Sequence, residues 1–120
     1  MKSVSVFGST GSVGQSTADV ILSQPDMFDV KVLTAHSNAD LLAEQALQLK
    51  PEMVVVADEA FYETLKEKLA GINIKVTAGT EALLEAAQVP ADIIMMAVSG
   101  FAGLAPLMKA IEQGTNVAIA

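Results

Sequence analysis

With 120 residues, 52% of them hydrophobic, the chain is long enough for one domain with a sizeable core. It contains no cysteine, which excludes disulfide bonds and thiolate metal sites, and no apolar run is long enough to span a bilayer. A net charge of −7, with dispersed lysines as the only basic residues, argues against a nucleic-acid partner. The N-terminus has no signal-peptide layout, so we expect a soluble, cytoplasmic protein without a membrane partner.

The first predicted element is a short apolar strand, Val4–Phe7, which leads directly into a glycine-rich loop. Gly8 suits a sharp turn, Gly11 lets the main chain approach a pyrophosphate, and Gly14 lets the next helix pack closely on the strand. The spacing is Gly-x-x-Gly-x-x-Gly rather than the commoner Gly-x-Gly-x-x-Gly. A plain tight turn is the alternative, but a glycine loop between a strand and a helix favours a phosphate-binding cradle.

The remaining elements alternate strictly between helices and strands. The first helix is indicated by side chains at helical spacing, which are Val13, Thr17, Val20 and Ile21. Further strands are predicted at residues 30–35, 53–57, 72–77, 93–98 and 115–120. Residues 53–57 and 93–98 are continuously apolar and are expected to be covered on both faces, whereas residues 72–77 alternate and suit a strand near a sheet edge.

The helices between these strands carry start signals and apolar faces. Asn38, Asp58 and Thr80 are the expected caps, and Gly71 and Gly114 are expected to end helices. The expected buried faces are Leu41, Leu42, Gln45, Ala46 and Leu49; Phe61, Leu65 and Leu69; Leu83, Leu84 and Ala87; and Leu104, Leu107, Met108 and Ile111.

This alternation predicts an α/β, Rossmann-like, doubly wound and mainly parallel sheet with helices on both faces. If the alternating strand lies at an edge, the strand order is 4-3-2-1-5-6, with a ligand crevice between the first and fifth strands. The loops Gly8–Gly14 and Ser99–Gly103 then lie on opposite lips of that crevice. The chain ends within an apolar strand, so we expect residues 1–120 to be one cofactor-binding domain of a longer protein.

The end of the second strand indicates which dinucleotide is bound. NAD-selective folds usually place a carboxylate there to bind the ribose 2′-hydroxyl, but this chain has His36, Ser37 and Asn38. NADP is therefore favoured, held without arginine or lysine by neutral donors and His36. The alternatives are an exposed loop histidine and an asparagine that only caps its helix.

Thr10 and Ser12 carry hydroxyl groups that can donate to phosphate oxygens, or else form local turn bonds. No pair of acidic residues has metal-ligand spacing, and no nucleophile and base can be paired around the single histidine. We therefore expect neither catalytic nor metal-binding residues in this chain.

The loop Gly8-Ser-Thr-Gly-Ser-Val-Gly14, continued by Thr17-Ala18-Asp19-Val20, closely resembles the opening of the 1-deoxy-D-xylulose 5-phosphate reductoisomerases. The likeness continues through residues 99–106 and 110–114 and covers essentially the whole chain. It implies an N-terminal NADPH-binding domain, followed by catalytic and C-terminal helical domains, in a non-mevalonate isoprenoid pathway enzyme. It also implies an Asn-Lys-Glu segment directly after Ala120.

Carried over to this chain, the resemblance implies that the pyrophosphate is held by Thr10, Gly11, Ser12 and Val13. The 2′-phosphate region falls at His36, Ser37 and Asn38, and Ala97 and Val98 line the crevice beside the cofactor. Many members have Gly-Lys where this chain has His36-Ser37, so the chain lacks a cation there.

The resemblance implies a sugar-phosphate substrate, a magnesium or manganese ion and a homodimer only for the full-length enzyme, while this chain alone should be inactive. Two alternatives stay open at this point. One is another NADPH-dependent reductase, of the semialdehyde dehydrogenase or dihydrodipicolinate reductase type. The other is a dinucleotide-sensing module that does no chemistry.

Overall fold

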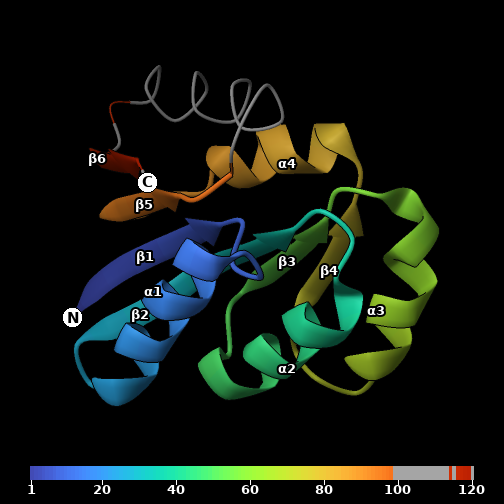
Figure 1. Cartoon of the computed structure of the whole chain (residues 1–120), viewed down its shortest axis with the longest axis horizontal. Helices are drawn as coiled ribbons and strands as arrows, with labels where there is room; N and C mark the ends of the chain where they lie inside the picture. Colours follow the sequence, from blue (N-terminus) through green and yellow to red (C-terminus); the bar gives the residue numbers. More distant parts are fainter. Residues whose placement is uncertain (99–113, 115, 120) are drawn as a thin grey trace.

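A parallel six-stranded sheet organises the computed structural model, which describes residues 1–98, 114 and 116–119 (Figure 1). The strand order is β4-β3-β2-β1-β5-β6, as predicted, with the half-exposed fourth strand at one edge. The strands are β1 (Lys2–Phe7), β2 (Phe28–Ala35), β3 (Met53–Val56), β4 (Lys75–Ala78), β5 (Ile93–Met96) and β6 (Asn116–Ile119).

Helices cover both faces of the sheet, which confirms the predicted doubly wound α/β class. Helices α1, α2 and α3 lie on one face, and α4 lies on the other (Figure 1). The described helices are α1 (Ser12–Ser23), α2 (Ala39–Leu49), the 3₁₀ turn η1 (Glu59–Phe61), α3 (Tyr62–Lys68) and α4 (Thr80–Ala87). None of them has the length and apolarity needed to cross a membrane.

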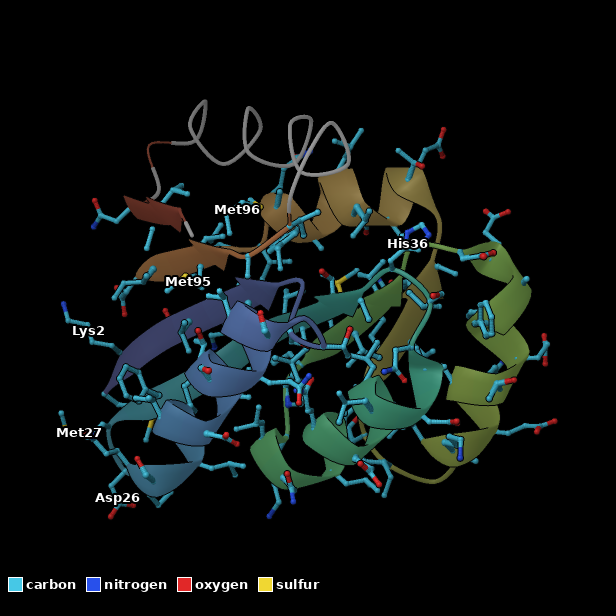
Figure 2. All side chains as sticks on the ribbon, viewed as in Figure 1. Lys2, Asp26, Met27, His36, Met95 and Met96 are labelled. Atoms are coloured by element: carbon cyan, nitrogen blue, oxygen red, sulfur yellow. The ribbon has the colours of Figure 1, made fainter. Side chains whose placement is uncertain are left out.

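The core has two parts because the sheet is buried from both sides. All four residues of β3 are buried, as its apolar run predicted. In β5 only Ile94 and Met96 are buried, whereas Ile93 and Met95 are half-buried, so the prediction of burial on both faces is only partly right. Met96 packs with α4, and Met95 packs against the cluster on the opposite face (Figure 2).

Of the four α1 residues at helical spacing, Val13, Thr17, Val20 and Ile21, only Ile21 is buried. Val13 and Val20 are 45% and 54% exposed, and the buried residues are Gly14, Ala18 and Ile21. Small side chains on this face let the helix lie close to the sheet, and the branched valines then point to solvent. A face of this kind is not evident from the pattern of large apolar residues, because glycine and alanine add little to the hydrophobicity of a helix face.

Three further expectations need correction where helices or strands begin. Phe61 is exposed rather than buried with Leu65, because η1 precedes α3 and changes the helical register. β4 begins at Lys75, which leaves Ile72 exposed before the strand. Thr80 is the first residue of α4 and makes no capping bond; Gly79, at a φ of 98°, is the cap residue.

The other helix signals agree with the structure. The Asn38 side chain accepts a hydrogen bond from the Leu41 N–H at 3.1 Å, and the Asp58 side chain accepts one from the Ala60 N–H at 3.0 Å. Gly71 follows α3 with a φ of 80°. The loop predicted at 99–103 and the helix predicted from Leu104 to Ile111 lie outside the described residues.

A reciprocal clamp joins the beginnings of β1 and β5, which are neighbours in the sheet. The Ser3 N–H and hydroxyl donate to Asp92 Oδ2 at 2.8 and 3.1 Å, and the Asp92 N–H donates to Ser3 Oγ at 2.8 Å. These donors stabilise the ionised carboxylate, so they hold the pKa of Asp92 below its ordinary value, with help from the charge of Lys2.

We expect Asp92→Asn to lower the free energy of unfolding at pH 7, by an amount that shrinks in acid. Because the folded-state pKa is lowered, the ionised clamp stabilises the fold above the unfolded-state value and loses this contribution as pH falls through the folded value. Urea unfolding of both proteins between pH 7 and about pH 3 measures the difference. Asp26→Asn, in the exposed turn after α1, is the control; a pH-independent difference would contradict the prediction.

Candidate functional site

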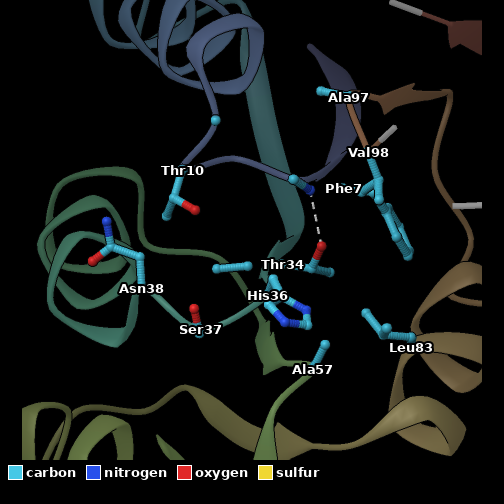
Figure 3. Close-up of a pocket in the computed structure, with 13 residues that line it drawn as sticks. Phe7, Thr10, Thr34, His36, Ser37, Asn38, Ala57, Leu83, Ala97 and Val98 are labelled. Atoms are coloured by element: carbon cyan, nitrogen blue, oxygen red, sulfur yellow. Dashed lines mark hydrogen bonds between the residues drawn. The ribbon is translucent and has the colours of Figure 1, made fainter. Parts of the chain in front are cut away.

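A pocket of about 500 Å³ opens at the carboxyl edge of the sheet, beside the ends of β1, β2, β3 and β5. Figure 3 shows polar side chains of Thr10, Ser37 and Asn38 on one side and Phe7 and Val98 on the other. In Figure 2, His36 lies far from Lys2 and Met27, which lie at the amino ends of β1 and β2. The pocket is lined by Phe7, Gly8, Thr10, Gly11, Thr34, Ala35, His36, Ser37, Asn38, Ala57, Leu83, Ala97 and Val98.

The turn after β1 is shaped by Gly8, which has a φ of 84°. A Cβ atom there would lie 2.9 Å from the Ala97 carbonyl oxygen, so glycine is required both by conformation and by space. The Gly8 N–H donates to Thr34 Oγ1 at 3.0 Å (Figure 3). The Ala97 N–H donates to the Phe7 carbonyl at 2.8 Å. These bonds hold the loop against both strands that flank β1.

Gly14 allows the start of α1 to approach the same turn. A Cβ atom at this position would lie 2.6 Å from Ser9 Cα. The close approach is therefore made to the backbone of the turn itself, whereas the sequence predicted an approach to the strand. In this way the two glycines fix the direction in which α1 leaves the loop.

Gly11 differs from Gly8 and Gly14, because its surroundings are open. It is exposed with extended backbone angles, and the nearest atom to a Cβ added at this position would be the Gly8 carbonyl oxygen, at 3.7 Å. Gly11 is the cap residue of α1, so the N–H groups of Ser12 and Val13 belong to the first turn, which has no intrahelical acceptors for them. Open space beside free N–H groups and the positive helix end suits an anion.

Two hydroxyl groups of the loop, those of Thr10 and Ser12, are also free to bind a ligand. Gln15 Nε2 donates to the Thr10 carbonyl at 2.9 Å, and Ser16 Oγ donates to the Ser12 carbonyl at 3.2 Å. Within the described residues, the Thr10 and Ser12 hydroxyls themselves have no hydrogen-bond partner. The local turn bonds considered as their alternative role are therefore not formed there.

The loop from β2 to α2 supplies the other polar side of the pocket. His36 and Asn38 are exposed, and Ser37 is half-buried. The Asp58 N–H donates to the His36 carbonyl at 2.8 Å, which ties this loop to the end of β3. The described residues that line the pocket include neither a carboxylate nor a lysine, and His36 is the only ionisable side chain among them.

Seven of the nine residues predicted for the site line the pocket, namely Thr10, Gly11, His36, Ser37, Asn38, Ala97 and Val98. Ser12 and Val13 do not; they lie in the first turn of α1. The sequence reasoning missed Phe7, Thr34, Ala57 and Leu83. The first three lie at or next to the carboxyl ends of predicted strands, which is a signal that could have identified them; Leu83 comes from α4 and had no such signal.

Among the described residues, no group of three histidine, aspartate or glutamate side chains is placed to hold a metal ion. The lining residues that the structure describes also include no nucleophile paired with a base. Its geometry thus suits binding of an elongated anionic ligand with an apolar part.

Comparison with known proteins gives a consistent result along the whole chain. The family model of 1-deoxy-D-xylulose 5-phosphate reductoisomerase matches residues 4–120. The chain is 48% identical over 120 residues to the reductoisomerase of Ruegeria sp. (strain TM1040), and the match covers 100% of this chain but 30% of that relative. A similar match, 46% identical over 117 residues, is found to the reductoisomerase of Wolbachia pipientis, of which 30% is covered.

The fold agrees equally well with a solved structure. The Zymomonas mobilis reductoisomerase in complex with NADPH has a TM-score of 0.97 and 43% identity, and the match covers 99% of this chain and 31% of that one. The chain thus spans about 30% of the length of the curated relatives it matches and shares their sequence features from the first strand onward. It belongs to the 1-deoxy-D-xylulose 5-phosphate reductoisomerase family.

Proposed function

We propose that this chain is the NADPH-binding domain of a longer reductoisomerase, which converts 1-deoxy-D-xylulose 5-phosphate to 2-C-methyl-D-erythritol 4-phosphate. The observation that carries the proposal is the pocket itself. On one side of this pocket of about 500 Å³ lie Gly11 and the N-terminus of α1. On the other lies the loop of residues 36–38, which has no carboxylate. Family membership supports the reductoisomerase over the semialdehyde dehydrogenase type and the sensing module.

In this proposal the two polar segments bind different phosphates. Thr10, Gly11, Ser12 and Val13 hold the pyrophosphate through N–H and hydroxyl groups at the start of α1. The loop 36–38 holds the 2′-phosphate, with Ser37 as a neutral donor. Asn38 Oδ1 already accepts the capping bond, which leaves its amide N–H₂ group as a donor.

The apolar side of the pocket fits the remainder of the cofactor. Ala97 and Val98 line the crevice along the path of the dinucleotide, and Phe7 and Leu83 extend this wall. An apolar wall opposite polar anchors is the usual composition of a dinucleotide site. When bound, NADPH supplies the hydride, and the residues of this chain bind and orient it.

The remaining functions of the enzyme belong, in our proposal, to other parts of the longer protein. Solved structures in this family include one in complex with magnesium and one in complex with NADPH, fosmidomycin and magnesium. The described residues provide no set of metal ligands, so the divalent cation and the sugar phosphate are assigned to residues beyond this chain. A homodimer of the full-length enzyme and a cytoplasmic location are proposed with it.

Cofactor preference tests the proposed site. We expect NADPH to bind more tightly than NADH, but with a smaller margin than a bidentate arginine would give, because neutral groups replace a fixed cation.

Dissociation constants of both dinucleotides, measured by calorimetry at neutral pH, decide this. His36→Gln is the matched variant and should keep the NADPH preference, since Ser37 and Asn38 remain as neutral donors. Equal affinities, or tighter NADH binding, would remove the 2′-phosphate assignment. A preference that His36→Gln abolishes would assign the 2′-phosphate to His36 rather than to the neutral donors.

We expect the 120-residue chain alone to show no reductoisomerase activity, because its described part contains no catalytic group. Incubation with 1-deoxy-D-xylulose 5-phosphate, NADPH and magnesium or manganese should consume no NADPH above the blank. The full-length protein under the same conditions is the positive control. Measurable turnover by the short chain would contradict the prediction.

A further inference from the structure

A buried pair of side chains joins the glycine loop to α2. Ser9 Oγ donates to Gln45 Oε1 at 2.7 Å, and Gln45 Nε2 donates to the Ser9 carbonyl oxygen at 2.8 Å. Ser9 is fully buried and Gln45 is 5% exposed. The side-chain amide of Gln45 therefore holds both the hydroxyl and the backbone of one loop residue.

The chemistry of Ser9 permits only one orientation of that amide. A carbonyl oxygen can only accept, so the Gln45 N–H₂ group must face the Ser9 backbone. The amide oxygen then faces the Ser9 hydroxyl, which has a single proton to donate. Reversing the amide would place two acceptors against each other, so this contact defines the position of the loop as well as stabilising it.

Ser9 itself is not available to bind a ligand. Its N–H donates to the Thr34 carbonyl at 2.8 Å, its hydroxyl and carbonyl are bonded to Gln45, and no part of it is exposed. A buried glutamine costs more to desolvate than an apolar side chain of its size unless it is fully bonded. Because Gln45 lies on the buried face of α2, we look for its role in the segments that it contacts.

Those segments are the two polar sides of the pocket. Ser9 directly precedes Thr10 and Gly11, and α2, which carries Gln45, begins at the capping residue Asn38. A helix is stiff over this length, so Gln45 connects the end of the 36–38 loop to the glycine loop through rigid backbone. Figure 3 shows Thr10 and Asn38 on the same side of the pocket, one from each segment.

We propose that Gln45 is a positioning residue for NADPH, which sets the separation between the pyrophosphate loop and the 2′-phosphate loop by clamping Ser9. The inference rests on the proposed function, since both loops are assigned there. A ligand that binds both loops at once depends on their separation, whereas a ligand that binds one loop does not. This difference separates positioning from a general structural role.

The test compares two ligands on the full-length protein and its Gln45→Met variant, which keeps the side-chain length and removes both bonds. NADPH contacts both loops, and adenosine 2′-monophosphate contacts only the 36–38 loop. We expect NADPH affinity to fall about tenfold, while adenosine 2′-monophosphate affinity changes less than about twofold.

Two substitutions on the same helix serve as controls. Gln48→Met changes an exposed glutamine, and Leu42→Val removes a methylene from a fully buried residue without touching Ser9. Both should leave the ratio of the two affinities unchanged, even if Leu42→Val lowers the melting temperature. Ser9→Ala removes the hydroxyl bond to Gln45, together with the longer contact of the same hydroxyl to the Thr34 carbonyl at 3.3 Å, and is the second variant if Gln45→Met does not fold. It should shift the ratio in the same direction by less.

The outcomes are distinguishable. Loss of NADPH affinity alone supports the proposal. Equal losses for both ligands, no loss for either, or failure of both variants to fold would show that the clamp is merely structural. If the unaltered protein binds neither adenosine 2′-monophosphate nor NADPH, the proposed function itself is wrong.

Discussion

Gly11→Val is expected to abolish NADPH binding while the fold persists. The nearest atom to a Cβ at this position is 3.7 Å away, and Gly11 has a φ of −75° and a ψ of 174°, which any residue adopts. A valine side chain therefore fits the protein but occupies the space that the pyrophosphate needs beside the first turn of α1. We expect a loss of about 100-fold or more in affinity.

Calorimetric titration with NADPH, together with thermal unfolding, measures both halves of this prediction. Gly11→Ala is the matched control, since it adds a single methyl group in the same place and should lose less affinity. A valine variant that binds NADPH as the parent does would place the phosphate cradle elsewhere. A valine variant that fails to fold would show that the open space around Gly11 is needed by the protein itself.

Gly14→Ala, unlike Gly11→Val, should destabilise the fold. Alanine is favoured over glycine within a helix by about 1 kcal/mol. However, the added Cβ would lie 2.6 Å from Ser9 Cα, and a backbone atom in a turn bonded to β2 cannot move aside at little cost. Overpacking of this kind costs about 3 kcal/mol, so we expect a net loss of about 2 kcal/mol in the free energy of unfolding.

Denaturant unfolding of Gly14→Ala beside Gly11→Ala gives the comparison directly, because both add one methyl group within the same loop. The first should unfold at clearly lower denaturant, and the second close to the parent. Equal midpoints would mean that the contact between α1 and the turn is looser than the structure shows. The pair thus separates the glycine that the fold needs from the one that we assign to the ligand.

Much of the fold could be predicted because its signals are local. The alternation in residues 72–77 indicated an edge strand, and β4 lies at the edge of the sheet. The errors arise where the buried surface is made by small residues, as with Gly14 and Ala18 in α1, or where a 3₁₀ turn shifts the register, as at Phe61. Neither effect changes the hydrophobic pattern from which helix faces are predicted.

The site was less predictable, because its parts meet only through the topology. The glycine loop and the 36–38 loop have motifs of their own, and both line the pocket. Leu83 and the bond between Ser9 and Gln45 depend on contacts between residues far apart in the chain, and no spacing rule reports them. The roles of these residues toward NADPH stay a prediction until binding is measured.

The clamp between Ser3 and Asp92 has a consequence for the order of folding. The contact between Gly8 and Thr34 closes a loop of 26 residues, whereas that between Ser3 and Asp92 closes one of 89, which costs about 1 kcal/mol more in chain entropy. We therefore expect β1 to pair with β2 before β5 docks on its other side. Since the pocket is lined by Gly8 after β1 and by Ala97 after β5, it is completed only when β5 docks, and a bound dinucleotide would shift the equilibrium toward the docked strand.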